Sequence, residues 1–362
     1  MFFNWFQKKK NTKGLIGVDV QADQLAIAHI LFATKKEDKP TLKQCVYKEL
    51  SSTDVKESSE TLLKMVQSFP ATQFSCNSVI DKNHYELLLI PPPNVEPDEL
   101  RQSVKWLIKD QLAYHIDDAI IDMFEIPGQQ SARAKLIYVV AAQKREIELQ
   151  AKLLKNSGLD IASIDIYELV QRNIAKLFEQ DKDGIVMLRL HEQSSLLTIT
   201  CNGVLYLTRT IDFGAQQIKA VLPLSFTDSA FSDSASSNTE SAVEDSDEEI
   251  ELFLDDDKEK HPASILNDQA KLILDNVILE IQRSLDYYVS HFNQRQVKKI
   301  VFSPMDQEIP GAIEYVNEML GIEAEFLDFN HYLNVSKPLS REIQVHCFEA
   351  IGLALRQDGT KE

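Results

Sequence analysis

Gly14-Leu-Ile-Gly-Val-Asp-Val20, followed by Gln21-Ala-Asp23, is the stretch that decides how this sequence is interpreted. Its run of apolar and β-branched residues predicts a buried strand, and the polar residues after it predict a turn. A turn that cradles a phosphate needs glycine, because its N–H groups must approach the phosphate without a Cβ in the way. Gln21 blocks that approach, and Asp23 adds negative charge beside it. This turn is therefore unsuited to a nucleotide.

A three-strand pattern like the one that begins at Gly14 occurs again after Gly184. Each copy has three apolar, β-rich segments separated by short polar turns. The segments are residues 15–20, 24–32 and 42–50 in the first copy, and 185–190, 195–201 and 204–211 in the second. Asn202-Gly203 is typical of a two-residue type I′ hairpin turn. Two such halves, each a mixed sheet with helices, predict an α/β, actin-like (ribonuclease H-like duplicated) fold with two lobes and a site between them.

The remaining segments divide the chain further. Pro91-Pro-Pro93 must end a strand, and Pro97 opens a helix that two strands and another helix follow, which indicates an inserted unit. The expected parts are a flexible aromatic and basic tail (1–13), a first lobe (14–77 with 161–180), an inserted βαββα subdomain (78–160), a second lobe (181–224 with 263–357) and an acidic insertion (225–262).

Charge is concentrated in the acidic insertion. Residues 225–262 hold 13 acidic side chains and two lysines, out of a net charge of −18 for the whole chain. Such a segment has too little apolar surface to offset the entropy of ordering, so we expect either a disordered, solvated insertion or an interaction tail. The aromatic and lysine-rich residues 1–13 predict either a mobile tail or contact with a membrane interface.

Composition excludes several classes of function. The acidic balance disfavours nucleic acid as a partner. No apolar run approaches the roughly 18–20 residues of a membrane span, and the N-terminus lacks the order of a secretory signal, which favours a cytoplasmic protein. Four scattered cysteines and histidines without ligand spacing argue against a metal site. Neither a Walker-type phosphate loop nor a Gly-x-Ser-x-Gly motif occurs.

Several blocks of the sequence carry a resemblance to a known family. They are residues 13–20, 97–106 with 136–144, 156–165, and 280–288. In this order and spacing they resemble the PilM family, which are cytoplasmic actin-like proteins of type IV pilus assembly, similar to the cell-division protein FtsA. The degenerate nucleotide loops and the acidic insertion look most like the MshI branch of that family, which acts in biogenesis of the mannose-sensitive haemagglutinin (MSHA) pilus.

The resemblance implies a role and a set of partners. Proteins of this family sit at the inner face of the inner membrane, peripheral to it, and bind a short N-terminal cytoplasmic peptide of the membrane protein PilN. The groove for that peptide lies beside the inserted subdomain, here residues 78–160. Through this link they connect the membrane platform with the cytoplasmic motor ATPase of fimbrium assembly.

Three loops that hold ATP in relatives are altered here. At the first, Asp19 is kept but Gln21 replaces glycine. At the second, Arg189 and His191 stand where Asp and Gly are expected. At the third, Ser303-Pro304 replaces glycines. We therefore predict a pseudo-ATPase that is not an enzyme, with no catalytic, cofactor-binding or metal-binding residue. The alternative is an actin-like ATPase that binds ATP and Mg²⁺ and cycles during pilus assembly.

Arg189 suggests how such a cleft could close without a ligand. In ATP-binding relatives two carboxylates face each other across the cleft around a hydrated Mg²⁺, and here Arg189 matches the second carboxylate. We expect Arg189 to approach Asp19 across the lobe interface and to form a charge-assisted pair with it. The alternative is that Arg189 points to solvent at the end of its strand.

Overall fold

The computed structural model describes residues 13–33, 38–51, 55–71, 73–127, 135–221 and 266–357. The expected acidic insertion, 225–262, and residues 1–12 of the expected tail lie outside the described residues.

The first sheet is built around β1 (Gly14–Val20). β1, β2 (Gln24–Leu31) and β3 (Thr41–Glu49) form an antiparallel meander. On its other side β1 pairs in parallel with β4 (Cys76–Val79), which pairs in parallel with β8 (Ile161–Asp165). The short β14 (Asn334–Val335) adds to the outer edge of β3, so the strand order is β14-β3-β2-β1-β4-β8.

The second sheet repeats this plan. β9 (Ile185–Leu190), β10 (Ser195–Cys201) and β11 (Val204–Ile211) form the second meander. β12 (Lys299–Phe302) and β13 (Glu323–Phe326) continue it in parallel, in the order β11-β10-β9-β12-β13. The duplicated mixed α/β architecture predicted from the sequence is confirmed. Asn202 and Gly203 have φ of 51° and 70°, as a type I′ turn requires.

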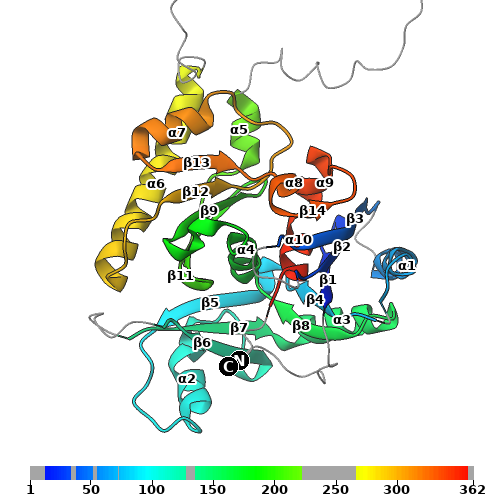
Figure 1. Cartoon of the computed structure of the whole chain (residues 1–362). Coiled ribbons are helices and arrows are strands. Elements are labelled where there is room, and N and C mark those ends of the chain that lie inside the picture. The colour runs from blue at the N-terminus through cyan, green and yellow to red at the C-terminus, as the bar shows by residue number, and fades with distance from the viewer. Residues whose placement is uncertain are drawn as a thin grey trace, which may run out of the picture.

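Two short helices lie between the sheets (Figure 1). They are α4 (Tyr167–Ala175) and α10 (Phe348–Ala354), and both are almost entirely buried. α10 packs closely on β1 because Gly17 has no side chain: a Cβ there would meet the backbone oxygen of Ala350 at 1.9 Å. A Cβ on Gly352 would in turn meet Val170 of α4 at 2.6 Å. Glycine thus permits both close contacts.

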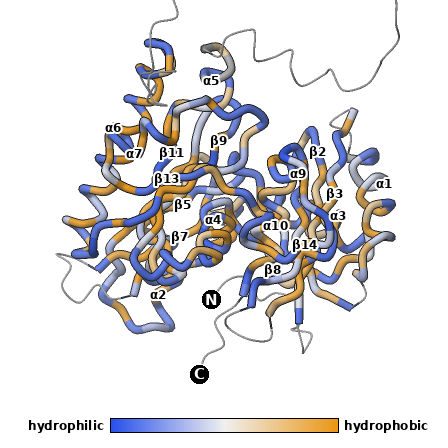
Figure 2. The backbone as a smooth tube through the Cα atoms, turned by 45° about the horizontal axis from the view of Figure 1, so that its top comes forward, coloured by the Kyte–Doolittle hydropathy of each residue, from blue (hydrophilic) through white to orange (hydrophobic). Residues whose placement is uncertain are grey.

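The outer helices cover the two sheets. α1 (Val55–Val66) and α3 (Lys144–Asn156) cover the first sheet, and α5 (Ala215–Val221), α6 (Asp268–Phe292) and α7 (Ala312–Leu320) cover the second. Hydrophobic residues are concentrated along the strands inside, while the outer helices alternate between hydrophobic and hydrophilic residues (Figure 2). Among the residues described, no helix is long and apolar enough to cross a membrane.

The end of the chain is placed differently from the expected division, which gave residues 263–357 to the second lobe. α8 (Phe329–Tyr332) leads to β14, and α9 (Arg341–His346) and α10 then pack against β3, β1 and β2 of the first sheet. α9 and α10 are separated at Cys347, where φ is −102° and ψ is 8°. Apolar periodicity predicts a helix here but not which of two sheets it covers.

The inserted unit is smaller than the expected 78–160. β5 (Tyr85–Ile90), β7 (Ile137–Gln143) and β6 (Ala119–Glu125) form an antiparallel sheet. α2 (Leu100–Ile108) covers one face of it with a separate small core. The last helix of the predicted βαββα pattern, α3, packs on β8 and α1 as well as on β7, so it joins the inserted unit to the first lobe.

Candidate functional site

The end of β1 buries a carboxyl group. Asp19 has no exposed surface, and its Oδ2 accepts a hydrogen bond of 2.6 Å from Gln21 Nε2. Its Oδ1 has no hydrogen-bond partner within the described part of the chain. Burial raises the pKa of Asp19 to about 8, and the charge of Glu349 adds to that effect. Asp19 is therefore largely protonated at neutral pH, whereas a carboxylate that binds a divalent cation must be ionised.

The turn after β1 is closed by its own residues. Gln21 donates its backbone N–H to Gln24 O at 2.9 Å, and its side chain folds back onto Asp19. Asp23 is exposed, and its carbonyl accepts a hydrogen bond of 2.7 Å from Leu50 N. The amide of Gln21 thus takes up the hydrogen-bonding capacity of Asp19 Oδ2.

Arg189 of β9 is buried and is bound to residues of α9 and α10. Its Nε and one terminal nitrogen donate to the two carboxylate oxygens of Glu349 at 2.9 and 3.2 Å. The same terminal nitrogen donates to Val345 O at 3.1 Å, and the guanidinium lies 4.5 Å from the centre of the Phe348 ring. The two-point contact with a carboxylate is the strongest form of such a pair.

The expected pair between Arg189 and Asp19 is therefore wrong in its partner, and the solvent-facing alternative is wrong as well. The partner is Glu349 on α10, a helix that packs on the first sheet, while Arg189 belongs to the second sheet. The pair thus still joins the two halves of the molecule. Arg189 remains near enough to Asp19 to lower its pKa, although less than burial raises it.

The loop after β9 is held against the start of α5. His191 O and Glu192 O accept hydrogen bonds of 2.8 and 2.9 Å from the N–H groups of Ala215 and Gln216. A Cβ on Gly214 would lie 2.5 Å from His191 O, so this close approach depends on glycine. The first N–H groups of α5, which a phosphate would need, already have partners.

The His191 ring is packed rather than available as a ligand. It meets the ring of Tyr167 edge-on at 5.9 Å, and its Nε2 is buried with no hydrogen-bond partner among the described residues. Burial, and then the charge of Arg189, lower the pKa of His191 to about 4. The imidazole is therefore neutral at physiological pH.

The third loop also turns its polar groups inward. Ser303 has no exposed surface; its N–H donates to Leu188 O at 2.9 Å and its hydroxyl accepts from Leu190 N at 3.3 Å. Pro304 is buried and, with Val345 from α9, lines a pocket of ≈ 50 Å³. Sites for small molecules measure roughly 300–1,000 Å³.

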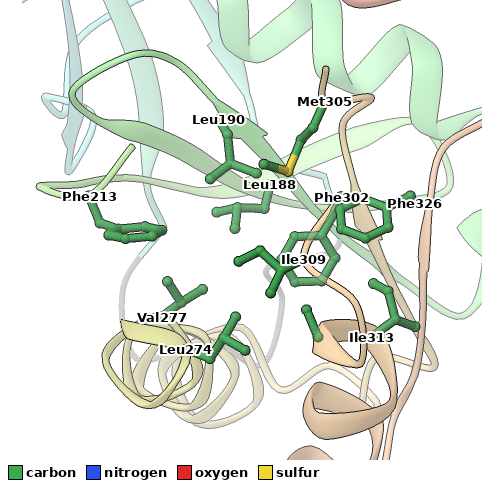
Figure 3. A pocket seen from close by; sticks show the side chains of 11 residues that line it. Leu188, Leu190, Phe213, Leu274, Val277, Phe302, Met305, Ile309, Ile313 and Phe326 are labelled. Carbon is green, nitrogen blue, oxygen red and sulfur yellow. The ribbon is translucent and has the colours of Figure 1, made fainter. Parts of the chain in front are cut away.

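The space behind this loop is a second, apolar cavity of ≈ 20 Å³ (Figure 3). Side chains from β9, β12, α6 and α7 converge on it, among them Leu188 and Phe302, together with Met305 of the loop after β12. It has room for about one water molecule and offers that water no polar partner. The side chains of the second lobe thus fill the region next to Ser303 and Pro304.

The seven residues singled out in the sequence lie at the ends of the central strands or just after them, as the topology requires. The structure brings four of them into one cluster: Asp19, Gln21, Arg189 and His191. Sequence reasoning missed Glu349 and Tyr167. A signal for Glu349 existed, because residues 348–354 are otherwise apolar and a buried charge needs a partner. Within the described residues, no group of three or more potential ligands could hold a metal ion.

The inserted unit contacts the body of the molecule through two tyrosines. Tyr85 OH donates to Glu168 Oε2 at 2.8 Å, and Tyr138 OH donates to Tyr206 O at 3.0 Å. The face of its sheet turned away from α2 carries apolar side chains that remain partly exposed. They are Leu87, Leu89, Ile120 and Phe124.

No protein-family model and no curated sequence matches this chain. A solved structure titled "PilM-PilN type IV pilus biogenesis complex" superposes with a TM-score of 0.64 at 14% identity, over 95% of this chain and 98% of that one. The cytoplasmic domain of EpsL, an inner-membrane component of the type II secretion system of Vibrio cholerae, gives 0.43 at 10% identity over 96% and 99%. A Bacteroides thetaiotaomicron protein with an actin-like ATPase fold gives 0.43 at 8% over 90% and 94%. The likeness to the PilM structure extends over nearly the whole chain, and this chain has the same actin-like fold.

Proposed function

We propose that this protein is a cytoplasmic adaptor of a type IV pilus machine of the MSHA type. In this proposal it docks the cytoplasmic N-terminal peptide of an inner-membrane PilN-type protein, is peripheral to the membrane through that partner, and does not hydrolyse ATP. Contact with the motor ATPase would place it between the membrane platform and the motor.

The proposal that this protein does not hydrolyse ATP rests on the bidentate pair of Arg189 and Glu349. The pair brings together two groups from opposite halves of the molecule at the end of β9, where a nucleotide-binding relative presents a carboxylate to the metal. The side-chain amide of Gln21 donates to Asp19, and the carbonyl oxygens of His191 and Glu192 accept from the first N–H groups of α5. The other polar groups of the site therefore also have partners. Each of these contacts would have to break before a triphosphate and Mg²⁺ could enter.

Support for the partner comes from the fold and from the inserted unit. The similar solved structure is, by its title, a complex of PilM with PilN. Here the inserted sheet leaves Leu87, Leu89 and Phe124 partly exposed on the side that faces the main body. Aliphatic and aromatic side chains of this kind suit the apolar anchors of a short extended peptide.

Binding of a synthetic peptide tests the proposal. A fluorescein-labelled peptide with the cytoplasmic N-terminal sequence of the PilN-type protein should show saturable anisotropy with the purified full chain, and a scrambled peptide should not. Leu87→Gln and Leu89→Gln should each weaken binding about tenfold, since an apolar anchor contributes ~1–2 kcal/mol.

The matched control is Leu107→Gln on α2. Leu107 is 51% exposed and lies on the helix that covers the other face of the same sheet. This variant should bind the peptide like the unaltered protein. No binding to the unaltered protein, or equal loss with all three variants, would reject docking at this face.

A further inference from the structure

Lysines gather where the parallel strands of the first sheet begin. β1, β4 and β8 run in the same direction, with Ile16 opposite Cys76 and Cys76 opposite Ile161, so all three begin at one edge of the sheet. α1 leads into β4 and α3 leads into β8, so both helices end at this edge. The two helices lie next to each other on the outer side of the sheet (Figure 1). We call this region the basic edge, after its exposed lysines Lys13, Lys64, Lys152 and Lys155.

The lysines of the basic edge lie at the ends of the two helices. Lys64 is in the last turn of α1 and Lys155 is in the last turn of α3, where a cation interacts favourably with the helix dipole. Lys152 is three residues before Lys155 and therefore shares its face of α3. Within the described part of the chain, Lys64 and Lys152 have no ion-pair partner. Their charges are thus available to a partner outside the chain.

Acidic side chains at these two helices lie mostly away from the basic edge. Glu146 and Glu148 are in the first half of α3, and Glu148 pairs with Lys144 at 4.0 Å. Asp160 does lie at the edge, where its Oδ2 accepts a hydrogen bond of 3.1 Å from Ser75 Oγ. In a chain with a net charge of −18, a surface with this excess of lysines favours an anionic partner.

Exposed leucines stand beside these lysines. Leu63 directly precedes Lys64 and is 44% exposed, and Leu149, three residues before Lys152 on the same face of α3, is 49% exposed. Lysines next to exposed aliphatic side chains suit a lipid surface, which attracts the charges and also accepts the apolar groups.

The sequence that precedes the basic edge has the same chemical character. Residues 1–12 contain three lysines, no acidic residue and the four aromatic side chains Phe2, Phe3, Trp5 and Phe6. Their point of attachment is fixed, because Lys13 O accepts a hydrogen bond of 2.7 Å from Phe32 N at the start of β1. Twelve residues span at most about 40 Å. A surface that buries these aromatic rings must therefore lie within that distance of the basic edge.

We propose that the basic edge and residues 1–12 together bind an anionic lipid surface. The lysines are attracted by the negative charge of the headgroups, and the aromatic rings are buried at the boundary between headgroups and acyl chains. Stable attachment of this kind needs two signals, such as an apolar one and a basic one, and this chain carries both at one edge. The surface is distinct from the peptide-docking face of the inserted sheet, and the inference does not depend on that face.

Tryptophan fluorescence with lipid vesicles tests the proposal, because the chain has two tryptophans, Trp5 and Trp106. Trp106→Phe leaves Trp5 as the reporter. Its emission should shift to the blue, and its quenching by iodide should fall, on addition of vesicles of phosphatidylcholine mixed with phosphatidylglycerol. Vesicles of phosphatidylcholine alone should have a much smaller effect. Trp5→Phe leaves Trp106, which is 63% exposed on α2, and its emission should not shift.

Sedimentation with the same mixed vesicles tests the lysines. The combined change Lys64→Gln, Lys152→Gln and Lys155→Gln should weaken binding about a hundredfold, because each basic residue near an anionic membrane contributes about fivefold. Binding of the unaltered protein should also weaken as salt concentration rises. Circular dichroism establishes that the variant is folded.

The matched control removes three exposed cations from the second lobe, by Lys182→Gln with Arg295→Gln and Lys298→Gln. This variant has the same net charge as the first and should bind the vesicles like the unaltered protein. Leu87→Gln, which tests peptide docking, should also leave vesicle binding unchanged. Equal loss in the two triple variants, a blue shift of Trp106 instead of Trp5, equal binding to the two kinds of vesicle, or no binding by the unaltered protein would overturn the proposal.

Discussion

Asp19 is buried beside a neutral donor, the side-chain amide of Gln21, and its burial makes the stability of the protein depend on pH. Its pKa in the folded protein is about 8, against 3.8 as the ordinary value. Between these two values the unfolded chain ionises Asp19 while the folded chain keeps it protonated. The unfolded state thus binds fewer protons, and the free energy of unfolding falls as pH rises from about 4 to about 8. Above about pH 8 this contribution is constant.

We predict that Asp19→Asn stabilises the protein at about pH 8. Asparagine keeps the shape and can accept from Gln21 but cannot ionise, so it removes the cost of a buried charge, on the order of 2–5 kcal/mol. Urea unfolding from about pH 5 to about pH 9 should show a flatter profile than that of the unaltered protein. Asp23→Asn, an exposed site in the same turn, is the control and should leave the profile as it is. An Asp19→Asn variant less stable at about pH 8 would show that the ionised form is required.

Arg189 and Glu349 should behave as one coupled unit. Arg189→Met and Glu349→Gln should each cost about 3–5 kcal/mol, because each leaves a buried charge without its partner. The combined change Arg189→Met with Glu349→Gln should cost much less than the sum of the single changes.

The control for this pair is Arg341 with Glu308. These side chains are 2.8 Å apart but substantially exposed, and Arg341→Met should cost less than about 1 kcal/mol. Urea unfolding of the variants measures all these values. If the combined variant lost as much free energy of unfolding as the two single variants together, the pair of Arg189 and Glu349 would not be the contact that joins the lobes.

At the scale of elements, the packing of α10 depends on Gly17 of β1, which lies against it, and on Gly352 within α10, which lies against α4. Gly17→Ala should destabilise the protein by about 3 kcal/mol or more, because the added Cβ meets backbone that can move only if α10 moves. Gly321→Asn is the matched control. Gly321 has a φ of 63° and no heavy atom within 4 Å of an added Cβ, and asparagine tolerates this conformation. It should cost less than about 1 kcal/mol in the same urea unfolding, and equal costs for the two variants would contradict the close packing.

The strands were predictable because their signals are local. The two meanders and the Asn202-Gly203 turn follow from apolar alternation and turn chemistry, and the structure agrees with the predicted strand ends within a few residues. The association of α9 and α10 with the first sheet was not predictable, because an apolar helix fits either sheet. Glu349 as the partner of Arg189 was missed for the same reason: the two are 160 residues apart in the chain, and only the fold brings them together.

At the scale of the whole molecule, two sheets enclose α4 and α10, and the groups that would face a nucleotide are bonded to one another instead. Asp19 is bound by Gln21, Arg189 by Glu349, and the first N–H groups of α5 by the loop at His191. Our account is that the pair of Arg189 and Glu349 holds the lobes together without a ligand, while the other two contacts keep the polar groups of each lobe occupied. The adaptor that we propose needs a stable surface, and a cleft stabilised by its own side chains would provide one without nucleotide turnover.

Isothermal titration with ATP and Mg²⁺ tests this account most directly. The preparation is first shown to be folded, by its circular dichroism and cooperative thermal unfolding. We predict no saturable heat at millimolar nucleotide, no shift of Tm and no release of phosphate above the rate in buffer. Saturable binding with a Kd in the micromolar range, which would raise Tm as the nucleotide concentration rises, would contradict the account and establish that the cleft opens to a nucleotide.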